Sequence, residues 1–298
     1  MEPDGIILID KPKGITSHDA VNRMRRLLRT KKIGHTGTLD PDATGLLVVL
    51  VGRAAKAAEY ITADEKEYDA VLRLGICTDT QDISGKIISE TENVPDAGKV
   101  LRVISSFEGE YMQTPPMYSA LKQNGRKLVD LARRGIEVER EPRKVEIINI
   151  NAEKINDNDY KMTVRCSKGT YIRTLCDDIG KKIGCGGCMA SLRRTKSGGY
   201  GIEDALTLDE CGNMTYEQLC ERLVPTESLF SSLPVIKLSG FFLKLCKSGC
   251  EIYQKKINTC YDPGQRVRLY DDEGFFSLGE IREFDGGSAV KSIKVFRL

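Results

Sequence analysis

The amino-acid sequence predicts an α+β fold with a small β-rich unit at its C-terminal end. Two spacings of apolar residues support this. In some segments an apolar residue recurs every three to four positions, which is typical of a helix, and in others apolar and polar residues alternate, which is typical of a strand. At 298 residues the chain is long enough for two domains, which we expect at residues 1–230 and 231–298. Short segments of strand length recur after a break at Pro225, at Val235, Val267, Phe275 and Val290.

The N-terminal elements are expected to be a strand, a helix and a second strand. Residues 6–9 form an apolar run of strand length, and the turn DKPKG follows them. Ser17 has the side chain of an N-cap, so we predict that a helix begins there. Residues 46–51 form a continuous apolar run that predicts a buried strand. The residues of the helix expected to face the core are Val21, Met24, Leu27 and Leu28.

The central segments continue this mixture of helices and strands. In KEYDAVLRLG, residues 66–75, every second residue from Tyr68 to Leu74 is apolar, which predicts a half-buried strand with the Tyr68 ring inward. Gly184 ends a helical pattern over residues 170–183, so Arg173 should lie in the first turn of that helix. Further expected elements are a helix with Val100, Val103, Ile104 and Phe107 on one face, strands over residues 145–150 and 160–166, and a helix over residues 216–223.

Composition and charge narrow the class of protein. No apolar run approaches the roughly 20 residues that span a bilayer. The N-terminal segment lacks the basic-then-apolar order of a signal peptide, so we expect a cytoplasmic protein whose ten cysteines are reduced. The net charge is only +2, yet basic residues greatly outnumber acidic ones within residues 20–39, 117–134 and 161–198. Such local basic surfaces favour a polyanionic partner, although solvated helix faces would give the same pattern.

The sequence gives little support for a zinc site, a catalytic triad or a nucleotide-binding motif. Cys185 and Cys188 have the spacing of metal ligands, but no second pair completes a zinc site, and a glycine-rich helix end is the alternative. Ser17, His18 and Asp40 could form a triad, yet no nucleophile elbow surrounds Ser17. The sequence has no Walker A or GxGxxG pattern. We therefore expect neither a metal ion nor another cofactor.

One carboxylate lies in an unusual loop. The stretch IGHTGTLDPDATGLLVVL, residues 33–50, places His35 and Asp40 among loop glycines directly ahead of the predicted buried strand. The proline after Asp40 favours an extended backbone at that aspartate. A plain Leu-Asp-Pro turn is the alternative. Asp42 is the competing acid, and its place after the proline favours an exposed turn residue.

Several separated motifs resemble one protein family. GHTGTLDPDATGLL, KEYDAVLRLG, TPPMYSALKQNGRKLVDLARRG, CSKGTYIRTLCDDIG and LRRTKSGGYGIEDAL together resemble the TruB family of tRNA pseudouridine synthases, in the expected order and over most of residues 5–206. The C-terminal segment resembles, less clearly, the small PUA-like RNA-binding domain that ends many members. The resemblance implies the pseudouridine synthase fold, a mixed and largely antiparallel sheet with flanking helices.

The resemblance also implies a reaction and the residues that carry it. The reaction is the isomerisation of uridine 55 in the T arm of tRNA to pseudouridine, without a cofactor. The implied site residues are Asp40 as the catalytic aspartate, Tyr68 against the target base, Arg173 paired with the aspartate, His35 prying the base from its loop, and Leu192 lining the uracil pocket.

The chemistry of these residues agrees with such a reaction. The glycosidic N1–C1′ bond must break and the uracil must reattach through C5, which consumes no redox equivalent. Asp40 can attack the sugar carbon or assist loss of the neighbouring proton, and the sequence leaves both routes open. Arg173 suits the pairing because its planar guanidinium can hold a carboxylate through two nitrogens. The base must leave its stack, and Tyr68 could stack on it once it is flipped.

The clustered basic residues are expected to contact tRNA phosphates, which fix the position of RNA without reading its sequence. Residues 113–140 resemble the thumb insertion by which stand-alone members grip the T arm, so we expect an enzyme that needs no guide RNA. We also expect a monomer. The alternatives from other classes are an RNA-binding or RNA-folding protein without synthase activity and a nucleobase glycosylase that releases free uracil. The candidate phosphate contacts are Arg23, Arg25, Arg26, Arg29, Lys122, Arg126, Lys127, Arg193, Arg194 and Lys196.

Overall fold

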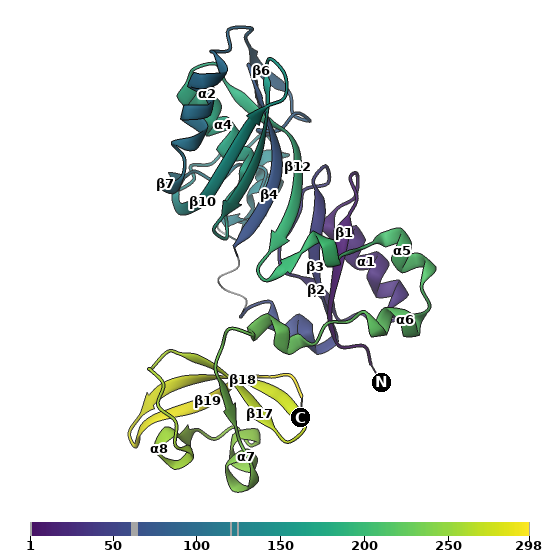
Figure 1. Ribbon diagram of the computed structural model, residues 1–298, viewed down its shortest axis with the longest axis vertical. Helices are drawn as coiled ribbons and strands as arrows, with labels where there is room; N and C mark the ends of the chain where they lie inside the picture. Colours follow the sequence, from purple (N-terminus) through teal and green to yellow (C-terminus); the bar gives the residue numbers. More distant parts are fainter. Residues whose placement is uncertain (1, 61–64, 120, 124, 298) are drawn as a thin grey trace.

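The computed structural model describes residues 2–60, 65–119, 121–123 and 125–297, arranged as Figure 1 shows. Within these residues ten strands form one sheet, whose main path runs β14-β1-β3-β12-β4-β11-β10-β7, with β2 paired to β3 and β13 paired to β12. The strands are β1 (Gly5–Lys11), β2 (Ile33–His35), β3 (Thr44–Val51), β4 (Lys66–Leu74), β7 (Gly109–Gln113), β10 (Arg143–Lys154), β11 (Asp159–Cys166), β12 (Gly187–Ser197), β13 (Tyr200–Gly201) and β14 (Leu206–Thr207).

Most neighbouring strands of this sheet are antiparallel. The pairs β1–β3, β4–β12, β4–β11, β10–β11 and β7–β10 are antiparallel, whereas β3–β12 and β1–β14 are parallel. The short β3–β12 pairing sets Thr44 beside Arg193. It therefore brings the loop that precedes β3 next to β12. The expected α+β fold with a mixed, largely antiparallel sheet is confirmed.

Two helices, α2 (Ala97–Ser105) and α4 (Ile172–Ile183), cover one face of this sheet. Figure 1 shows them side by side against the strands. Every second residue of β4 from Tyr68 to Leu74 is buried in the same apolar cluster as the two helices, as the alternation predicts. α4 ends at Gly184, whose φ of 92° is the left-handed conformation that glycine adopts without strain.

Helix α1 (Ser17–Leu27) packs on β1 and β3 through an apolar face that includes Met24. The predicted N-cap at Ser17 is wrong by one residue. Thr16 caps the helix, because its side chain accepts a hydrogen bond from the Asp19 backbone N–H and the Asp19 carboxylate accepts one from the Thr16 N–H. Ser17 instead turns its hydroxyl into the protein.

Shorter elements connect these layers. The helix predicted over residues 216–223 ends two residues earlier, at Glu221. The remaining elements of this part are η1 (Gly52–Ala57), β5 (Ile76–Thr78), β6 (Ile87–Glu90), β8 (Lys122–Gln123), β9 (Arg126–Lys127), α3 (Leu128–Ala132), η2 (Ile202–Asp204), α5 (Leu208–Asn213), α6 (Tyr216–Glu221) and η3 (Thr226–Phe230).

A second sheet, of order β15-β17-β18-β19-β16, has an apolar core of its own. Tyr60 of the first part joins it, since the Tyr60 hydroxyl donates to the Ile293 carbonyl and Arg266 donates to the Tyr60 carbonyl. The boundary expected at residue 231 stays a prediction. The elements of this part are β15 (Val235–Lys237), α7 (Gly240–Lys247), β16 (Ile252–Tyr253), α8 (Gln254–Ile257), β17 (Arg266–Asp271), β18 (Gly274–Phe284) and β19 (Gly287–Val295).

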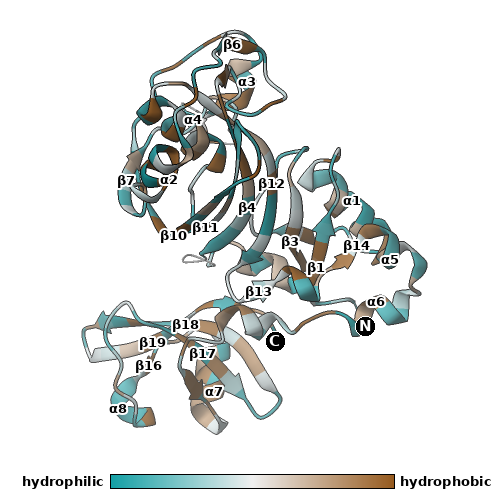
Figure 2. Ribbon diagram, turned by 45° about the horizontal axis from the view of Figure 1, so that its top comes forward, coloured by the Kyte–Doolittle hydropathy of each residue, from teal (hydrophilic) through white to brown (hydrophobic). Residues whose placement is uncertain are grey.

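Apolar residues concentrate in the interior, and Figure 2 shows the hydrophobic stretches of β1 and β3 in brown. Among the described residues, no helix is both long and apolar enough to cross a membrane.

Candidate active site

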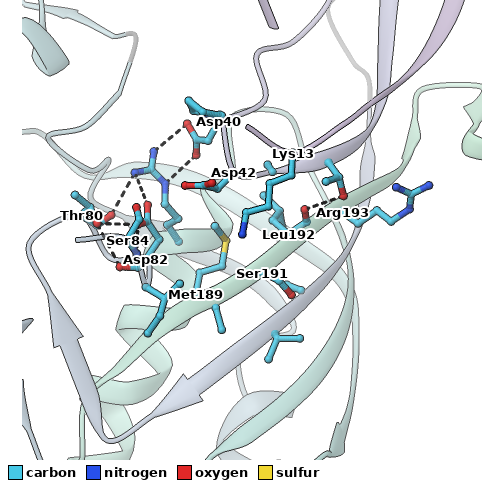
Figure 3. Close-up of a pocket in the computed structure, with 18 of the residues that line it drawn as sticks. Lys13, Asp40, Asp42, Thr80, Asp82, Ser84, Met189, Ser191, Leu192 and Arg193 are labelled. Carbon is cyan, nitrogen blue, oxygen red and sulfur yellow. Dashed lines mark hydrogen bonds and ion pairs between the residues drawn. The ribbon is translucent and has the colours of Figure 1, made fainter. Parts of the chain in front are cut away.

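A cavity of about 780 Å³ opens between the loop that precedes β3, strands β4 and β12, the loop that joins β5 to β6, and the N-terminal end of α4. Figure 3 shows Asp40 and Asp82 on two sides of one guanidinium in this cavity. Tyr118 and Arg133, from the segment 113–140, form part of its wall. The volume lies within the range of about 300–1,000 Å³ that is typical of ligand sites.

The loop that carries Asp40 is held in place by buried polar contacts. The Ser17 hydroxyl accepts a hydrogen bond from the Leu39 N–H at 2.8 Å and donates to the Leu39 carbonyl at 3.0 Å. Lys11 is fully buried, and its Nζ donates to three backbone carbonyls, including that of Pro41 at 3.2 Å. Because both contacts flank Asp40, they fix the backbone from which its carboxylate projects. Ser17 is thus engaged with the backbone and does not form the triad.

Arg173 lies in ion-pair contact with Asp40. Its Nε is 3.0 Å from Asp40 Oδ2, and its Nη2 is 3.4 Å from Oδ1, so the guanidinium faces the carboxylate with two nitrogens. The Arg173 side chain is only 7% exposed, whereas that of Asp40 is 41% exposed. The carboxylate therefore remains open to the cavity while its cationic partner is enclosed.

The other donors of Arg173 are fixed as well. Nη1 contacts the Thr80 carbonyl at 3.2 Å and Asp82 Oδ2 at 3.4 Å, and Nη2 donates to the Tyr118 carbonyl at 2.8 Å. Charge-assisted contacts on so many sides leave the guanidinium little freedom to rotate. Arg173 is therefore oriented toward Asp40 before any substrate arrives.

Asp82 was missed by sequence reasoning. Its Oδ1 accepts hydrogen bonds from the Thr80 hydroxyl and from the Ser84 N–H and hydroxyl, and this leaves Oδ2 for Arg173. The signal in the sequence is the run TDTQDIS, in which hydroxyl residues two positions on either side of an aspartate favour a turn bonded to that aspartate.

Opposing effects set the protonation of Asp40. Burial raises the pKa of the Asp40 carboxyl, the positive charge of Arg173 lowers it, and the negative charge of Asp82 raises it again. The net effect is a pKa above the ordinary value for aspartate. Arg173 therefore favours the ionised form of Asp40, which burial and Asp82 disfavour.

Tyr68 lies close to this site but outside the cavity wall. It is 7% exposed, packs in one apolar cluster with Leu39 and Ala43, and is not among the described residues that line the cavity. Burial raises the pKa of its phenol, and the positive charge of Arg194 opposes that effect. The Tyr68 ring is thus not part of the wall of this cavity.

His35 and Leu192 differ in their placement. Leu192, on β12, lines the cavity. His35 ends β2 outside the cavity wall, and its buried Nδ1 has no hydrogen-bond partner in the part of the chain that the structure describes. Burial lowers the pKa of His35, and the charge of Arg194 lowers it further. The imidazole is therefore neutral at pH 7.

Arg194 does not have the exposed position expected of a phosphate contact. It is 1% exposed, and its guanidinium donates to the carbonyls of Leu46 at 2.7 Å and Gly37 at 3.1 Å. Gly45 lies so close that a Cβ there would stand 2.3 Å from the Arg194 carbonyl oxygen. Arg194 therefore supports the Asp40 loop from inside, and it is too enclosed to contact a phosphate.

The remaining basic candidates fall into three groups. Arg26, Arg29, Arg126 and Lys196 are exposed, and Lys196 also pairs with Glu67 at 3.5 Å. Three others have partners of their own, since Arg23 pairs with Asp209, Arg193 pairs with Asp10, and Arg25 donates to the Ile33 carbonyl. The side chains of Lys122 and Lys127 lie outside the described part of the structure.

No group of three or more His, Cys, Asp or Glu side chains that could hold a metal ion occurs among the described residues. Cys185 and Cys188 are both buried.

Comparison with known proteins gives two consecutive family matches. Residues 25–172 match the model described as the TruB family pseudouridylate synthase N-terminal domain, and residues 173–231 match the tRNA pseudouridylate synthase B C-terminal domain. A tRNA pseudouridine synthase B from Clostridium tetani is 42% identical, over 93% of this chain and 95% of that protein. The protein of the same name from Alkaliphilus oremlandii is 41% identical, over 99% and 98%.

Solved structures with a similar fold include a Cbf5-Nop10-Gar1 complex, with a TM-score of 0.74 and 27% identity over 99% of this chain and 85% of that chain. An H/ACA RNP bound to a substrate RNA containing 2′-deoxyuridine gives a TM-score of 0.73 and 25% identity over 100% and 86%.

Proposed function

Since the chain belongs to the TruB family of tRNA pseudouridine synthases, we propose that the nucleotide it isomerises is uridine 55 in the T arm of tRNA. The observation that carries the proposal is the two-nitrogen contact between Arg173 and Asp40 at the edge of a cavity large enough for a nucleotide. Such a carboxylate, open to the cavity and held by an enclosed cation, is a suitable reactive group. Asp82, which contacts the same guanidinium, is the less exposed of the two, at 18% against 41%.

Asp40 acts directly on the sugar of the flipped nucleotide. Its carboxylate either attacks C1′ or takes the proton from C2′, and both routes break the N1–C1′ bond and leave its electron pair on the uracil. The uracil then turns and bonds to C1′ through C5, which displaces Asp40 or returns the proton to C2′, and the loss of the C5 proton and the gain of one at N1 complete the isomerisation. Arg173 keeps Asp40 ionised and fixes its direction, while Asp82 holds Arg173 from the other side. The charged network thus supplies orientation and charge balance, and Asp40 supplies the reacting oxygen.

Base flipping must precede this step because a stacked base is out of reach. Leu192 lines the pocket for the uracil. Tyr68 is proposed to contact the base after the apolar residues packed around its ring, such as Leu39 and Ala43, have shifted. His35, at the end of β2, is proposed to enter the RNA loop in the place that the flipped base leaves.

We infer that the enzyme acts alone, as a monomer and without a guide RNA, on tRNA in the cytoplasm. Tyr118, Val129 and Arg133 support action without a guide RNA, because through them the segment 113–140 reaches the cavity and can hold the T arm beside it. The C-terminal sheet is proposed to be a PUA-like RNA-binding domain that begins near residue 231.

The position of the target can be tested with tRNA transcribed with C5-tritiated uridine. The purified protein alone should release close to one equivalent of tritium per tRNA, and none from a transcript in which uridine 55 is replaced by cytidine. Equal release from both transcripts would overturn the assignment of position 55. Free uracil among the products would instead identify a glycosylase.

Binding of tRNA should depend on salt through the exposed cations. A triple variant, Arg26→Gln with Arg29→Gln and Arg126→Gln, is expected to bind more weakly and to lower the slope of log Kd against log salt by about 2, because each phosphate contact contributes roughly 0.7 to a single-stranded site. Filter binding in 50–300 mM KCl, a range chosen on the order of physiological salt, measures this slope.

A matched control removes three cations from the helices on the covered face of the sheet, by Lys99→Gln with Arg102→Gln and Lys182→Gln. Its net charge equals that of the first variant, so its slope should stay that of the wild type. Equal slopes for the two variants would show that net charge, and not the proposed surface, controls binding.

A further inference from the structure

Gln81 has an uncommon backbone conformation beside the active site. Its φ is +63°, in the left-handed region that residues other than glycine rarely adopt. Such a conformation persists only where the surroundings hold it in place. Gln81 stands between Thr80 and Asp82, the two residues whose oxygens contact Arg173 Nη1.

The side chain of Gln81 bonds to helix α4 with both ends of its carboxamide. Its Nε2 donates to Asp177 Oδ2 at 2.8 Å, and its Oε1 accepts from the Thr174 hydroxyl at 2.8 Å. Thr174 and Asp177 are 2% and 6% exposed, and they lie one and four residues after Arg173 on the same helix. Lys181 contacts the same Asp177 oxygen at 2.6 Å and so fixes the acceptor.

The backbone of the same loop is fixed to β12 on its other side. The Gln81 carbonyl accepts from the Met189 N–H at 3.0 Å, and the Ile83 N–H donates to the Met189 carbonyl at 2.9 Å. The loop is thus held to the sheet through its backbone and to α4 through Gln81. Apart from the contacts that Arg173 itself makes, the bonds of Gln81 are the ones that join this loop to α4 among the described residues.

We propose that Gln81 is a positioning residue for the isomerisation. Its carboxamide holds the left-handed turn against α4, so that the Thr80 carbonyl and the Asp82 carboxylate both meet Arg173 Nη1 and leave Nε and Nη2 aligned with Asp40. Gln81 does not line the cavity, so it acts through Arg173 and makes no contact with RNA. This inference rests on the proposed roles of Asp40 and Arg173.

Loss of the two Gln81 side-chain hydrogen bonds should lower kcat and leave tRNA binding unchanged. Gln81→Leu keeps a side chain of similar size but can neither donate nor accept, and we expect kcat to fall by about 10- to 100-fold, the range in which misplacement of a catalytic group by about 1 Å is felt. Gln81→Gly removes the backbone strain together with the bonds, and it should lose kcat as well. KM and the Kd for tRNA should stay within about threefold in both variants, since no RNA contact is lost.

A reciprocal exchange separates positioning from general damage. Gln81→Glu alone places a carboxylate against the Asp177 carboxylate, and the two repel each other. We expect its kcat to fall at least as far as that of Gln81→Leu. In the double variant Gln81→Glu with Asp177→Asn, the new amide at position 177 can donate to the new carboxylate at position 81, and the total charge of the pair is that of the wild type. We expect kcat to recover most of the loss. Asn156→Ala, which removes an amide from the turn between β10 and β11, is the control with kcat unchanged.

The outcomes are separable. The proposal would be overturned if Gln81→Leu had the kcat of the wild type or changed only in KM. It would also be overturned if the double variant Gln81→Glu with Asp177→Asn had a kcat no higher than that of Gln81→Glu alone. Asp40→Asn is measured in the same assay. If Asp40→Asn is inactive and the Gln81 variants are fully active, the positioning role alone fails, whereas an active Asp40→Asn enzyme removes the proposed function itself.

Discussion

Asparagine in place of Asp40 is expected to abolish tritium release, with a loss in rate of about 10⁴-fold or more at saturating enzyme, as when a residue that reacts directly is removed. The amide has nearly the shape of the carboxylate, but it can neither attack C1′ nor take a proton from C2′. The fold should persist, because the enclosed Arg173 keeps its ion pair with Asp82 and its bonds to the Thr80 and Tyr118 carbonyls. Single-turnover tritium release together with tRNA binding measures both parts of the prediction.

Asp42→Asn is the matched control for Asp40→Asn. Asp42 also lines the cavity, two residues away, but it is exposed and makes none of the contacts with Arg173. Its loss should change the rate only a few-fold. If the two variants lost activity equally, the aspartate that reacts would remain undecided. An Asp40→Asn protein that still refolds tRNA would show that an RNA-folding role exists separately from the isomerisation.

The fold was largely predictable because its elements follow local hydrophobic patterns. Period-two alternation located β4, and helical spacing with Gly184 located α4. The N-cap error had a local signal too, since Thr16 followed by Asp19 three residues later is a capping box. The order of the strands depends on long-range pairing, such as Thr44 beside Arg193, and it was not predicted. The family resemblance implied only a mixed, largely antiparallel sheet.

The site was predictable only in part, for physical reasons. Asp82 and Asp40 lie on different loops, and nothing local indicates that both meet Arg173. Arg194 was misplaced because adjacent basic residues were treated as one surface. Consecutive residues of a strand point to opposite faces, so one of Arg193 and Arg194 was bound to point inward. Burial of a whole arginine needs backbone acceptors, here at Leu46 and Gly37, that only the folded chain supplies.

Replacing Arg173 is expected to give the second largest loss. Arg173→Lys keeps a positive charge but loses the planar fork that meets Asp40 with two nitrogens, so the rate should fall by about 10²- to 10³-fold, similar to the loss of one preorganised donor in other enzymes. Affinity for tRNA should change little, because the guanidinium is enclosed.

Arg173→Met should add a change in pH dependence whose direction follows from the charges. In the wild type, burial raises the pKa of Asp40 and Arg173 opposes that effect. Without the guanidinium, burial and the negative charge of Asp82 act unopposed on this side, so the pKa of Asp40 rises further. The reactive form is the ionised carboxylate, and the acid limb of the rate profile must therefore move to higher pH. Single-turnover rates between about pH 5 and 9 bracket the range in which a raised carboxyl pKa falls. An acid limb that stays in place, or moves to lower pH, would mean that Arg173 serves the reaction by some means other than holding Asp40 ionised.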